Sequence, residues 1–154
     1  MDPEQPTNYE LLVVNSPDDW NAYHQIRREE LFEARGRYGI YNPHHPDESL
    51  QNHFPLLLKY NGIAIATVRL DVQEDRAVVR LVAVTRSEQS KGHGRVLGEN
   101  VEDFVRRKGI KKLVVNAAPD AVGYYERLGF SREIWDGAEL KGMFANVVQM
   151  AKRL

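Results

Sequence analysis

Apolar residues recur along the chain with two different periods, and the change of period marks the expected elements. Alternating or continuous apolar stretches, typical of strands, lie at 9–14, 55–60, 63–72, 77–84, 111–116, 130–135 and 143–152. Apolar residues spaced as on one helical face lie at 17–34, 93–108 and 119–128. This order predicts an α/β (α+β) fold, with a mixed, mostly antiparallel central sheet flanked by helices.

Turn and cap residues support these boundaries. Ser16 can cap a helix that begins at Pro17 and runs to about Ala34. Asn61-Gly62 is a strong hairpin signal, and Gly109 and Gly129 are natural helix stops. The expected buried face of the first helix consists of Trp20, Tyr23, Ile26, Arg27, Leu31 and Ala34.

Residues 35–54 have no clear period and are rich in Gly, Pro, Asn and aromatic side chains. They predict a long loop with a short helix near residues 47–52. Loops of this length in a compact domain often carry function.

Length and composition narrow the class of protein. The chain has 154 residues, enough for one domain, which we expect at 9–154 after a flexible tail at 1–8. The net charge of -1 gives no reason to expect nucleic-acid or membrane binding. With Cys 0, a thiol nucleophile and disulfides are excluded. The polar N-terminus does not resemble a signal peptide, so a cytoplasmic location is expected.

Residues 81–95 combine a strand end, a polar loop and a helix start. A helix start exposes N–H groups that lack intrahelical partners, and the macrodipole makes that end positive. Gly92 and Gly94 lack the Cβ atoms that would keep a ligand from the backbone, while Lys91 and Arg95 add positive charge. This stretch is therefore suited to hold a phosphate or pyrophosphate.

Two common phosphate-binding patterns do not fit. A Walker loop needs Gly-Lys followed by Ser or Thr, but His93 follows Gly92. A dinucleotide fingerprint needs its third glycine one residue earlier than Gly98. The stretch from Gln89 to Gly94 (QSKGHG) instead resembles the Gln/Arg-x-x-Gly-x-Gly/Ala loop of the GNAT-superfamily acetyltransferases. Taken alone, this hexapeptide also fits a plain strand-to-helix turn.

A second stretch strengthens the resemblance. Residues 116–130 begin with Asn116 at a strand end and continue into a helix with Tyr125-Glu126 and then Gly129-Phe130. This pattern is similar to the second GNAT signature, and both motifs occur in the family's order. The resemblance covers the chain from about Pro55 to its end.

The resemblance implies acetyl-CoA as co-substrate and assigns residues to it. The implied coenzyme A-binding residues are Val82, Val84, Gln89, Ser90, Lys91, Gly92, His93, Gly94, Arg95, Asn116 and Tyr125. It also implies that the pantetheine arm pairs with the strand at Val82 and Val84, in a space where this strand splays from the strand at Leu113. The ring of His93 is expected to pack or to face solvent, and Asn116 also fits a plain strand-end turn.

Acetyl transfer from a thioester needs stabilisation of an oxyanion and protonation of a thiolate. By resemblance, the Val84 N–H is the oxyanion donor and Tyr125 the general acid. A phenol has a pKa of about 10 and a thiol about 8.5, so Tyr125 could act by hydrogen bonding alone. Tyr125 also fits a core aromatic, although Tyr124 is the expected core member.

The general base is left open among Glu48, His53, Asp71, His93 and an ordered water. We expect no metal site, because the chain has no Cys and no His-x-x-x-His. Four residues are candidates to bind a carboxylate on the acceptor: Arg37, Tyr38, Arg69 and Arg80. The simpler interpretation of Arg69 and Arg80 is pairing with Asp71 or Glu10 on a solvated face.

The sequence therefore predicts an N-acetyltransferase that moves an acetyl group from acetyl-CoA to a small-molecule primary amine in a ternary complex. The alternatives are a non-catalytic acyl-CoA-binding or regulatory module and an acetyltransferase acting on a protein amine. A homodimer is compatible with the resemblance, with the C-terminal strand as a candidate interface.

Overall fold

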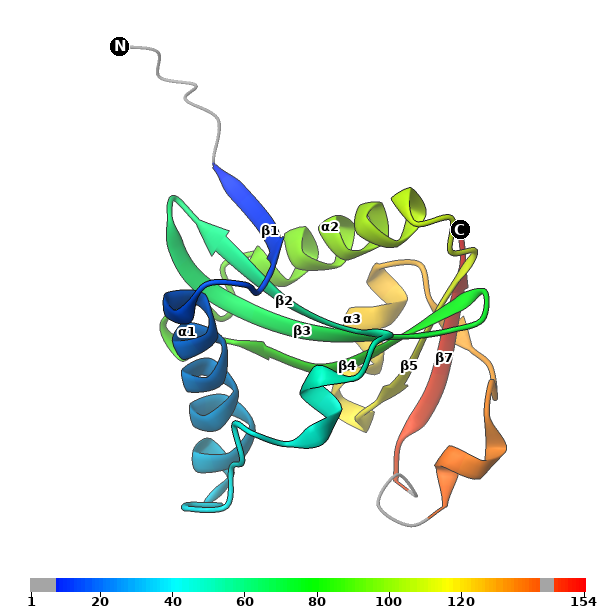
Figure 1. The fold of residues 1–154 in the computed structure, drawn as a ribbon. Coiled ribbons are helices and arrows are strands. Elements are labelled where there is room, and N and C mark those ends of the chain that lie inside the picture. Colours follow the sequence, from blue (N-terminus) through cyan, green and yellow to red (C-terminus); the bar gives the residue numbers. More distant parts are fainter. Residues whose placement is uncertain (1–7, 142–145) are drawn as a thin grey trace. The chain divides into compact units, whose positions relative to one another are not determined.

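The computed structural model describes residues 8–141 and 146–154. Its strands and α-helices follow the predicted order (Figure 1). They are β1 (Tyr9–Val13), α1 (Pro17–Arg27), β2 (His53–Tyr60), β3 (Ile63–Gln73), β4 (Arg76–Val84), α2 (His93–Arg107), β5 (Lys112–Ala117), α3 (Val122–Arg127), β6 (Ser131–Arg132) and β7 (Val148–Arg153). A π-helical turn spans Arg28–Phe32, and short 3-10 turns lie at Glu33–Arg35, Pro46–Ser49, Arg86–Glu88, Pro119–Ala121 and Gly137–Leu140.

The strands form one mixed sheet in the order β1-β2-β3-β4-β5-β7-β6. The β1–β2, β5–β7 and β6–β7 pairs are antiparallel, whereas β4 and β5 run parallel with Arg76 opposite Lys112 and Val79 opposite Val115. A mostly antiparallel sheet with flanking helices confirms the predicted fold class.

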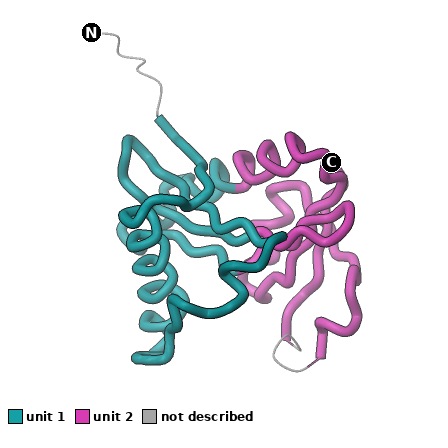
Figure 2. The backbone as a smooth tube through the Cα atoms, in the orientation of Figure 1, with its two compact units in different colours: residues 1–69, 81–97 teal, residues 70–80, 98–154 magenta. Residues whose placement is uncertain are grey.

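The chain divides into two compact units, and β3 and β4 contribute residues to both (Figure 2). Unit 1 comprises residues 1–69 and 81–97, and unit 2 comprises residues 70–80 and 98–154. The buried core of unit 1 is built from Val14, Tyr23, Ile26, Leu57 and Ala83. In unit 2 a buried cluster is built from Val78, Val114, Trp135 and Ala151.

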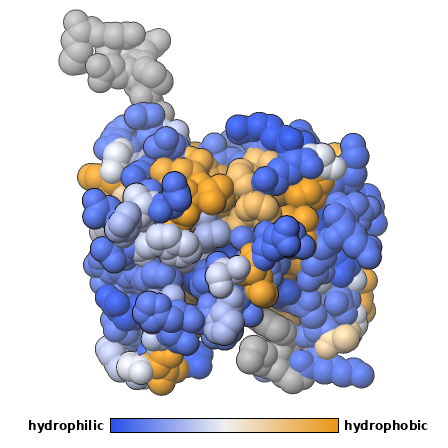
Figure 3. All heavy atoms as spheres, in the orientation of Figure 1, coloured by the Kyte–Doolittle hydropathy of each residue, from blue (hydrophilic) through white to orange (hydrophobic). Residues whose placement is uncertain are grey.

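Hydrophilic residues dominate the surface drawn in Figure 3, in keeping with a charged fraction of 28%. Across the two described ranges, no helix is long and apolar enough to cross a membrane.

The turn signals were correct where they depend on local backbone conformation. Asn61 and Gly62 have φ values of 51° and 83°, as a tight hairpin turn between β2 and β3 requires. Gly109 and Gly129 follow α2 and α3 with φ values of 77° and 96°. Both glycines occupy the left-handed conformation that ends many helices.

The prediction of one helix from Pro17 to about Ala34 is wrong beyond Arg27. The Glu33 N–H bonds the Arg28 carbonyl, five residues back, so a π-helical turn replaces the α-helical pattern there. An extra residue in a turn rotates everything that follows around the helix axis. Ala34 is consequently exposed rather than on the buried face.

Two other predicted spans also need correction. The strand expected at 130–135 is limited to Ser131–Arg132, because the backbone N–H of Trp135 donates to the Gln149 side chain instead of to a neighbouring strand. The last strand, expected at 143–152, is Val148–Arg153. Residues 143–145 of that expectation lie outside the described residues, as do residues 1–7 of the expected tail.

Candidate active site

The glycine loop of unit 1 connects the end of β4 to the first residue of α2. Ser90 and Gly92 have φ values of 63° and 85°, and α2 begins immediately afterwards at His93. A left-handed residue next to a right-handed one, as Gly92 is next to the helical His93, turns neighbouring backbone N–H groups toward a common point, which is how nests bind anions. The N-terminus of a 15-residue helix adds its own N–H groups and dipole. The loop can therefore accept a phosphate group from its exposed side.

The backbone of the loop is open at Gly92. A Cβ atom built on Gly92 would meet nothing within 4 Å. The protein itself therefore leaves the space beside this backbone unfilled. A ligand can approach the Gly92 backbone closely, provided that no side chain is added there.

Side chains from the same unit hold the loop in shape. The Gln89 amide Nε2 donates to the Val84 carbonyl at 2.8 Å, closing the loop onto the end of β4. Glu30, on the π-helical turn, accepts from the Arg86 backbone N–H at 3.0 Å. The Lys91 ammonium lies 2.9 Å from Glu88, and its hydrogen bond lowers the pKa of the Glu88 carboxyl. Glu30 is a contact that sequence reasoning missed.

His93 is buried, with 5% of its surface exposed. Its Nδ1 lies 2.6 Å from the Tyr9 hydroxyl, and its Nε2 lies 3.4 Å from a Glu88 carboxylate oxygen. The ring also packs 4.8 Å from the Tyr60 ring, centroid to centroid. The expectation that this ring packs is confirmed, and the position of His93 at the helix start leaves its backbone in the loop.

The end of β4 contains an unusual backbone conformation. Leu81 has a φ of 54°, which is rare for a bulky side chain and interrupts regular strand geometry. Val82 and Val84, the residues expected to pair with the pantetheine arm, follow it and are half-buried. The Thr85 N–H then bonds the Ile65 carbonyl on β3 at 2.8 Å. Local apolar patterning contains no signal for this irregularity.

Tyr125 belongs to unit 2 and is buried on α3, with 7% of its surface exposed. Its ring lies 4.9 Å from the Tyr124 ring and 5.3 Å from the Phe130 ring, centroid to centroid. Burial, and next the neighbouring Tyr124, raises the pKa of the Tyr125 phenol above its usual value of 10. The phenol is therefore a hydrogen-bond donor at every physiological pH.

The expectation that Tyr124 is the core member of this pair is wrong. Tyr124 is only half-buried, and burial raises its pKa to about 12. A 3-10 turn over Pro119–Ala121 precedes the six-residue helix α3. So short a helix, entered from a tighter turn, cannot be assigned a buried face from its sequence spacing.

Asn116, on β5, has both ends of its side-chain amide bonded within unit 2. Its Nδ2 donates to Glu139 Oε1 at 2.9 Å, and its Oδ1 accepts from Gln149 Nε2 at 3.0 Å. Neither partner was singled out from the sequence. Glu139 lies between the strands expected at 130–135 and 143–152, where a loop is expected, and Gln149 is a polar residue in an apolar strand.

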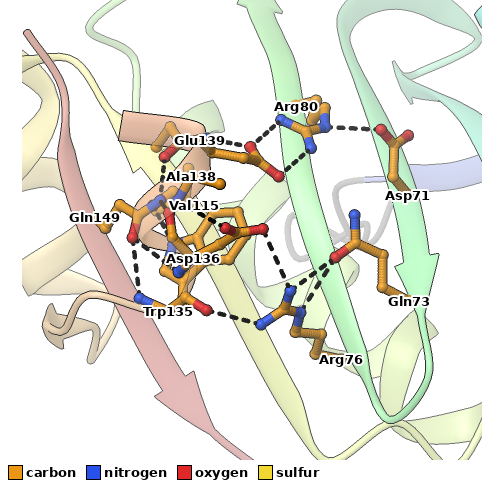
Figure 4. Close-up of polar contacts among 11 residues, drawn as sticks. Asp71, Gln73, Arg76, Arg80, Val115, Trp135, Asp136, Ala138, Glu139 and Gln149 are labelled. Carbon is orange, nitrogen blue, oxygen red and sulfur yellow. Dashed lines mark hydrogen bonds and ion pairs between the residues drawn. The ribbon is translucent and has the colours of Figure 1, made fainter. Parts of the chain in front are cut away.

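The two strand arginines are both paired with carboxylates. Arg80 donates from Nε to Asp71 at 2.7 Å and from Nη1 and Nη2 to Glu139 at 3.1 and 3.0 Å (Figure 4). Arg69 lies 3.7 Å from Glu48. Pairing of Arg80 with Asp71 is confirmed, but the expected solvated face is wrong. Arg69 and Asp71 are 6% and 4% exposed, because each has a partner of opposite charge, Glu48 for Arg69 and Arg80 for Asp71.

The remaining acceptor candidates lie on the 35–54 segment and are exposed. The Arg37 guanidinium lies 5.3 Å from the centre of the Phe32 ring, and Tyr38 is 71% exposed. Their position leaves them accessible to an acceptor without any rearrangement of buried groups.

All four side chains considered as a base already have partners. Glu48 contacts the Arg27 guanidinium and accepts from the Tyr23 hydroxyl at 3.2 Å. His53 Nδ1 lies 2.6 Å from the Asp47 carbonyl oxygen. Asp71 pairs with Arg80 and His93 with Tyr9, as described above. The geometry therefore singles out none of them.

The sequence of this chain is similar to that of known acetyltransferases. A family model described as the Acetyltransferase (GNAT) family matches residues 20–130. The chain is also 22% identical, over 118 residues, to a protein of Bacillus subtilis (strain 168) that is provisionally named an acetyltransferase. The match covers 76% of this chain and 80% of that protein.

Solved structures share the fold at low sequence identity. An acyl-CoA N-acyltransferase from Pseudomonas aeruginosa superposes with a TM-score of 0.75 at 17% identity, covering 96% of this chain and 99% of that one. The ribosomal-protein-S18-alanine N-acetyltransferase of Escherichia coli gives 0.71 at 19% identity, with coverage of 95% and 94%. The PaiA N-acetyltransferase of Thermoplasma acidophilum, in complex with coenzyme A, gives 0.70 at 16% identity, with coverage of 96% and 99%.

The family model spans most of the chain and includes the glycine loop, Asn116 and Tyr125. This chain belongs to the GNAT family of acetyltransferases.

Proposed function

We propose that this enzyme transfers an acetyl group from acetyl-CoA to the primary amine of a small molecule, directly and within a ternary complex. The observation that carries the proposal is the glycine loop. It joins the left-handed Gly92, open on its ligand side, to the start of a 15-residue helix. That combination suits the pyrophosphate of coenzyme A.

Two groups supply the chemistry in this proposal. The backbone N–H of Val84 stabilises the oxyanion that forms on the thioester carbonyl. The Tyr125 hydroxyl donates a hydrogen bond to the departing thiolate. Because burial raises the pKa of this phenol, complete proton transfer to a thiolate is more unfavourable than in water, and hydrogen bonding is the favoured role.

The absence of the usual thiol nucleophile supports direct transfer. The chain has no cysteine, so a thioester intermediate on a side-chain thiol is excluded. The acceptor nitrogen attacks the acetyl carbonyl carbon, the carbon–sulfur bond breaks, and the nitrogen loses its proton. Free coenzyme A leaves with a thiol hydrogen.

The acceptor in this proposal is a small amine that can carry a carboxylate. Arg37 and Tyr38 are exposed and can meet such a carboxylate first. Arg69 pairs with Glu48, and Arg80 pairs with Asp71 and Glu139. An acceptor carboxylate would share these guanidinium groups with the acidic residues that already bind them.

A protein amine is the second candidate acceptor. It is favoured by the structural similarity to an enzyme named for the S18 ribosomal protein, which nevertheless shares only the fold at 19% identity. The net charge of -1 provides no overall charge that would favour docking of a strongly charged protein. Turnover on a panel of free amines compared with a panel of peptides separates the two candidates.

The first test is calorimetric titration of acetyl-CoA and of free coenzyme A into the parent protein and into Gly92→Asp. The proposal predicts binding of both ligands by the parent and its loss in Gly92→Asp, since a carboxylate would then face the pyrophosphate. A folded parent that binds neither ligand would refute the proposal.

A further inference from the structure

One carboxylate in unit 2 joins two residues that were assigned separately to the two substrates. Glu139 Oε1 accepts from Asn116 Nδ2 at 2.9 Å and from Arg80 Nη1 at 3.1 Å. Glu139 Oε2 accepts from Arg80 Nη2 at 3.0 Å (Figure 4). Asn116 is the residue assigned to the pantetheine arm, and Arg80 is a candidate for the acceptor. Glu139 therefore ties a donor-side residue to an acceptor-side residue.

These bonds fix which way the Asn116 amide faces. A carboxylate only accepts, so the Asn116 nitrogen must face Glu139. Gln149 Nε2 only donates, so the Asn116 oxygen must face Gln149. An amide nitrogen has two hydrogens, and Glu139 uses one of them. The second N–H therefore keeps a defined direction, and a ligand carbonyl placed in that direction can accept from it.

The same carboxylate fixes Arg80. Glu139 takes both terminal nitrogens of the guanidinium, and Asp71 takes Nε, so each guanidinium nitrogen has an acidic partner. Arg80 has only 18% of its side chain exposed, and a paired planar guanidinium at this depth has little freedom to rotate.

Hydrogen bonds also hold the segment that carries Glu139. Glu139 lies on the 3-10 turn Gly137–Leu140, which the Asp136 carboxylate caps by accepting from the Ala138 N–H at 3.0 Å. Gln149, 4% exposed, makes three hydrogen bonds to Trp135 and Asp136, which directly precede this turn, and a fourth to Asn116. Its Oε1 accepts from the N–H groups of Trp135 and Asp136, and its Nε2 donates to the Asp136 carbonyl as well as to Asn116.

We propose that Glu139 is a positioning residue for acetyl transfer. It sets the Asn116 amide so that one N–H meets the pantetheine arm of acetyl-CoA, and it holds Arg80 at the same time. This proposal rests on the proposed function, because Asn116 must contact acetyl-CoA for its orientation to matter.

The test measures the dissociation constant of acetyl-CoA by calorimetry in matched variants. Glu139→Leu removes the acceptor, whereas Glu139→Gln keeps an oxygen for Asn116. Asn116→Leu and the double variant with Glu139→Leu complete a mutant cycle. Glu133→Gln is the control. It removes a carboxylate that pairs with Lys112 and Arg153 in the same unit but contacts neither Asn116 nor Arg80. Circular dichroism and the unfolding midpoint confirm that each variant is folded.

We expect Glu139→Leu to weaken acetyl-CoA binding about tenfold, or about 1.4 kcal/mol. Asn116→Leu should weaken it by a similar factor, and the double variant by no more than Asn116→Leu alone. Glu139→Gln should stay within about threefold of the parent, and Glu133→Gln within about twofold.

Three results would overturn this role of Glu139 in different ways. Weakening by Asn116→Leu but not by Glu139→Leu would show that Asn116 needs no positioning. Losses that add in the double variant would show that Glu139 acts independently of Asn116. If acetyl-CoA binding is lost in Gly92→Asp but unchanged in Asn116→Leu, Asn116 does not contribute to binding, and its positioning by Glu139 has no role there. In this binding experiment, the proposed function itself would be overturned by a folded parent that fails to bind acetyl-CoA.

Discussion

Replacing Gly92 by Ala separates the role of this glycine in folding from its role in binding, because Gly62 provides a matched control. Gly92 and Gly62 have φ values of 85° and 83°, and a Cβ built on either meets nothing within 4 Å. Both are exposed. Alanine at either position therefore costs only the strain of a left-handed backbone, roughly 1–2 kcal/mol.

The stability loss should be the same for both variants. For a chain of this length, 1 kcal/mol lowers the unfolding midpoint by about 2–4 °C, so a loss of about 2–8 °C is expected for either. Urea unfolding should give free energies that agree within about 0.5 kcal/mol, because neither variant introduces a steric clash.

Binding should distinguish the two variants. The backbone strain is present with and without ligand, so it cancels from the affinity, and only the added methyl group can weaken binding. On Gly92 that methyl faces the space assigned to the pyrophosphate, so the acetyl-CoA dissociation constant should rise by about tenfold or more. On Gly62 it should stay within about twofold of the parent.

Gly92→Asn adds a further check. Asparagine tolerates the left-handed conformation, so this variant should recover most of the stability lost by Gly92→Ala. It should not recover binding, because its side chain is larger. Equal affinities for Gly92→Ala and the parent would refute the reasoning, as would equal weakening by Gly62→Ala.

Three further predictions follow from buried or crowded side chains. Tyr125→Phe should lower kcat about 100-fold, measured as coenzyme A release at saturating acetyl-CoA, because phenylalanine cannot donate a hydrogen bond to the departing thiolate. The kcat of the parent should show no loss from phenol ionisation up to about pH 10, since burial raises the pKa of Tyr125. Burial, and next Arg27, lowers the pKa of His24 below 6.5, so below that pH the unfolded chain binds the proton first. Urea midpoints should therefore fall from pH 7 to 5, and less so in His24→Gln. A Cβ on Gly98 would lie 2.6 Å from Leu128 Cδ1, so Gly98→Ala should lower the free energy of unfolding by about 1 kcal/mol, measured by urea unfolding. The same substitution should not destabilise a Leu128→Ala variant, because the crowding side chain is then absent.

Local sequence signals predicted the framework of this fold because each rests on a short-range physical rule. The Asn61-Gly62 turn and the glycine stop at Gly109 follow from backbone conformations that few residues can adopt. The strands and α2 follow from apolar periods that one buried face imposes. These features are set by residues close in sequence and depend little on contacts with distant segments.

The errors arose where distant groups decide the local structure. The π-helical turn at Arg28–Phe32 accompanies a contact between Glu30 and the Arg86 backbone, 56 residues away in sequence. The strand after Phe130 ends early because Gln149 competes for the backbone N–H groups of Trp135 and Asp136. Periodicity within one segment cannot report such competition.

The candidate site divides in the same way. The glycine loop and Tyr125 belong to contiguous motifs that the sequence displays directly. Glu139 was missed because its role comes from Arg80 and Asn116, which precede it by 59 and 23 residues. From the sequence alone, a polar residue in an expected loop cannot be assigned contacts with residues of distant strands, because only the folded sheet brings them together.

The most direct test of acetyl transfer is the release of coenzyme A from acetyl-CoA in the presence of amines. The chain has no cysteine, so a thiol reagent reads only coenzyme A. We expect saturable, amine-dependent thiol release, matched one to one by acetylated small amine in mass spectrometry and reduced about 100-fold in Tyr125→Phe. Release with peptides but with no small amine would contradict the proposed acceptor class. Tight binding of acetyl-CoA without release to any amine or peptide would contradict catalysis and indicate a binding module.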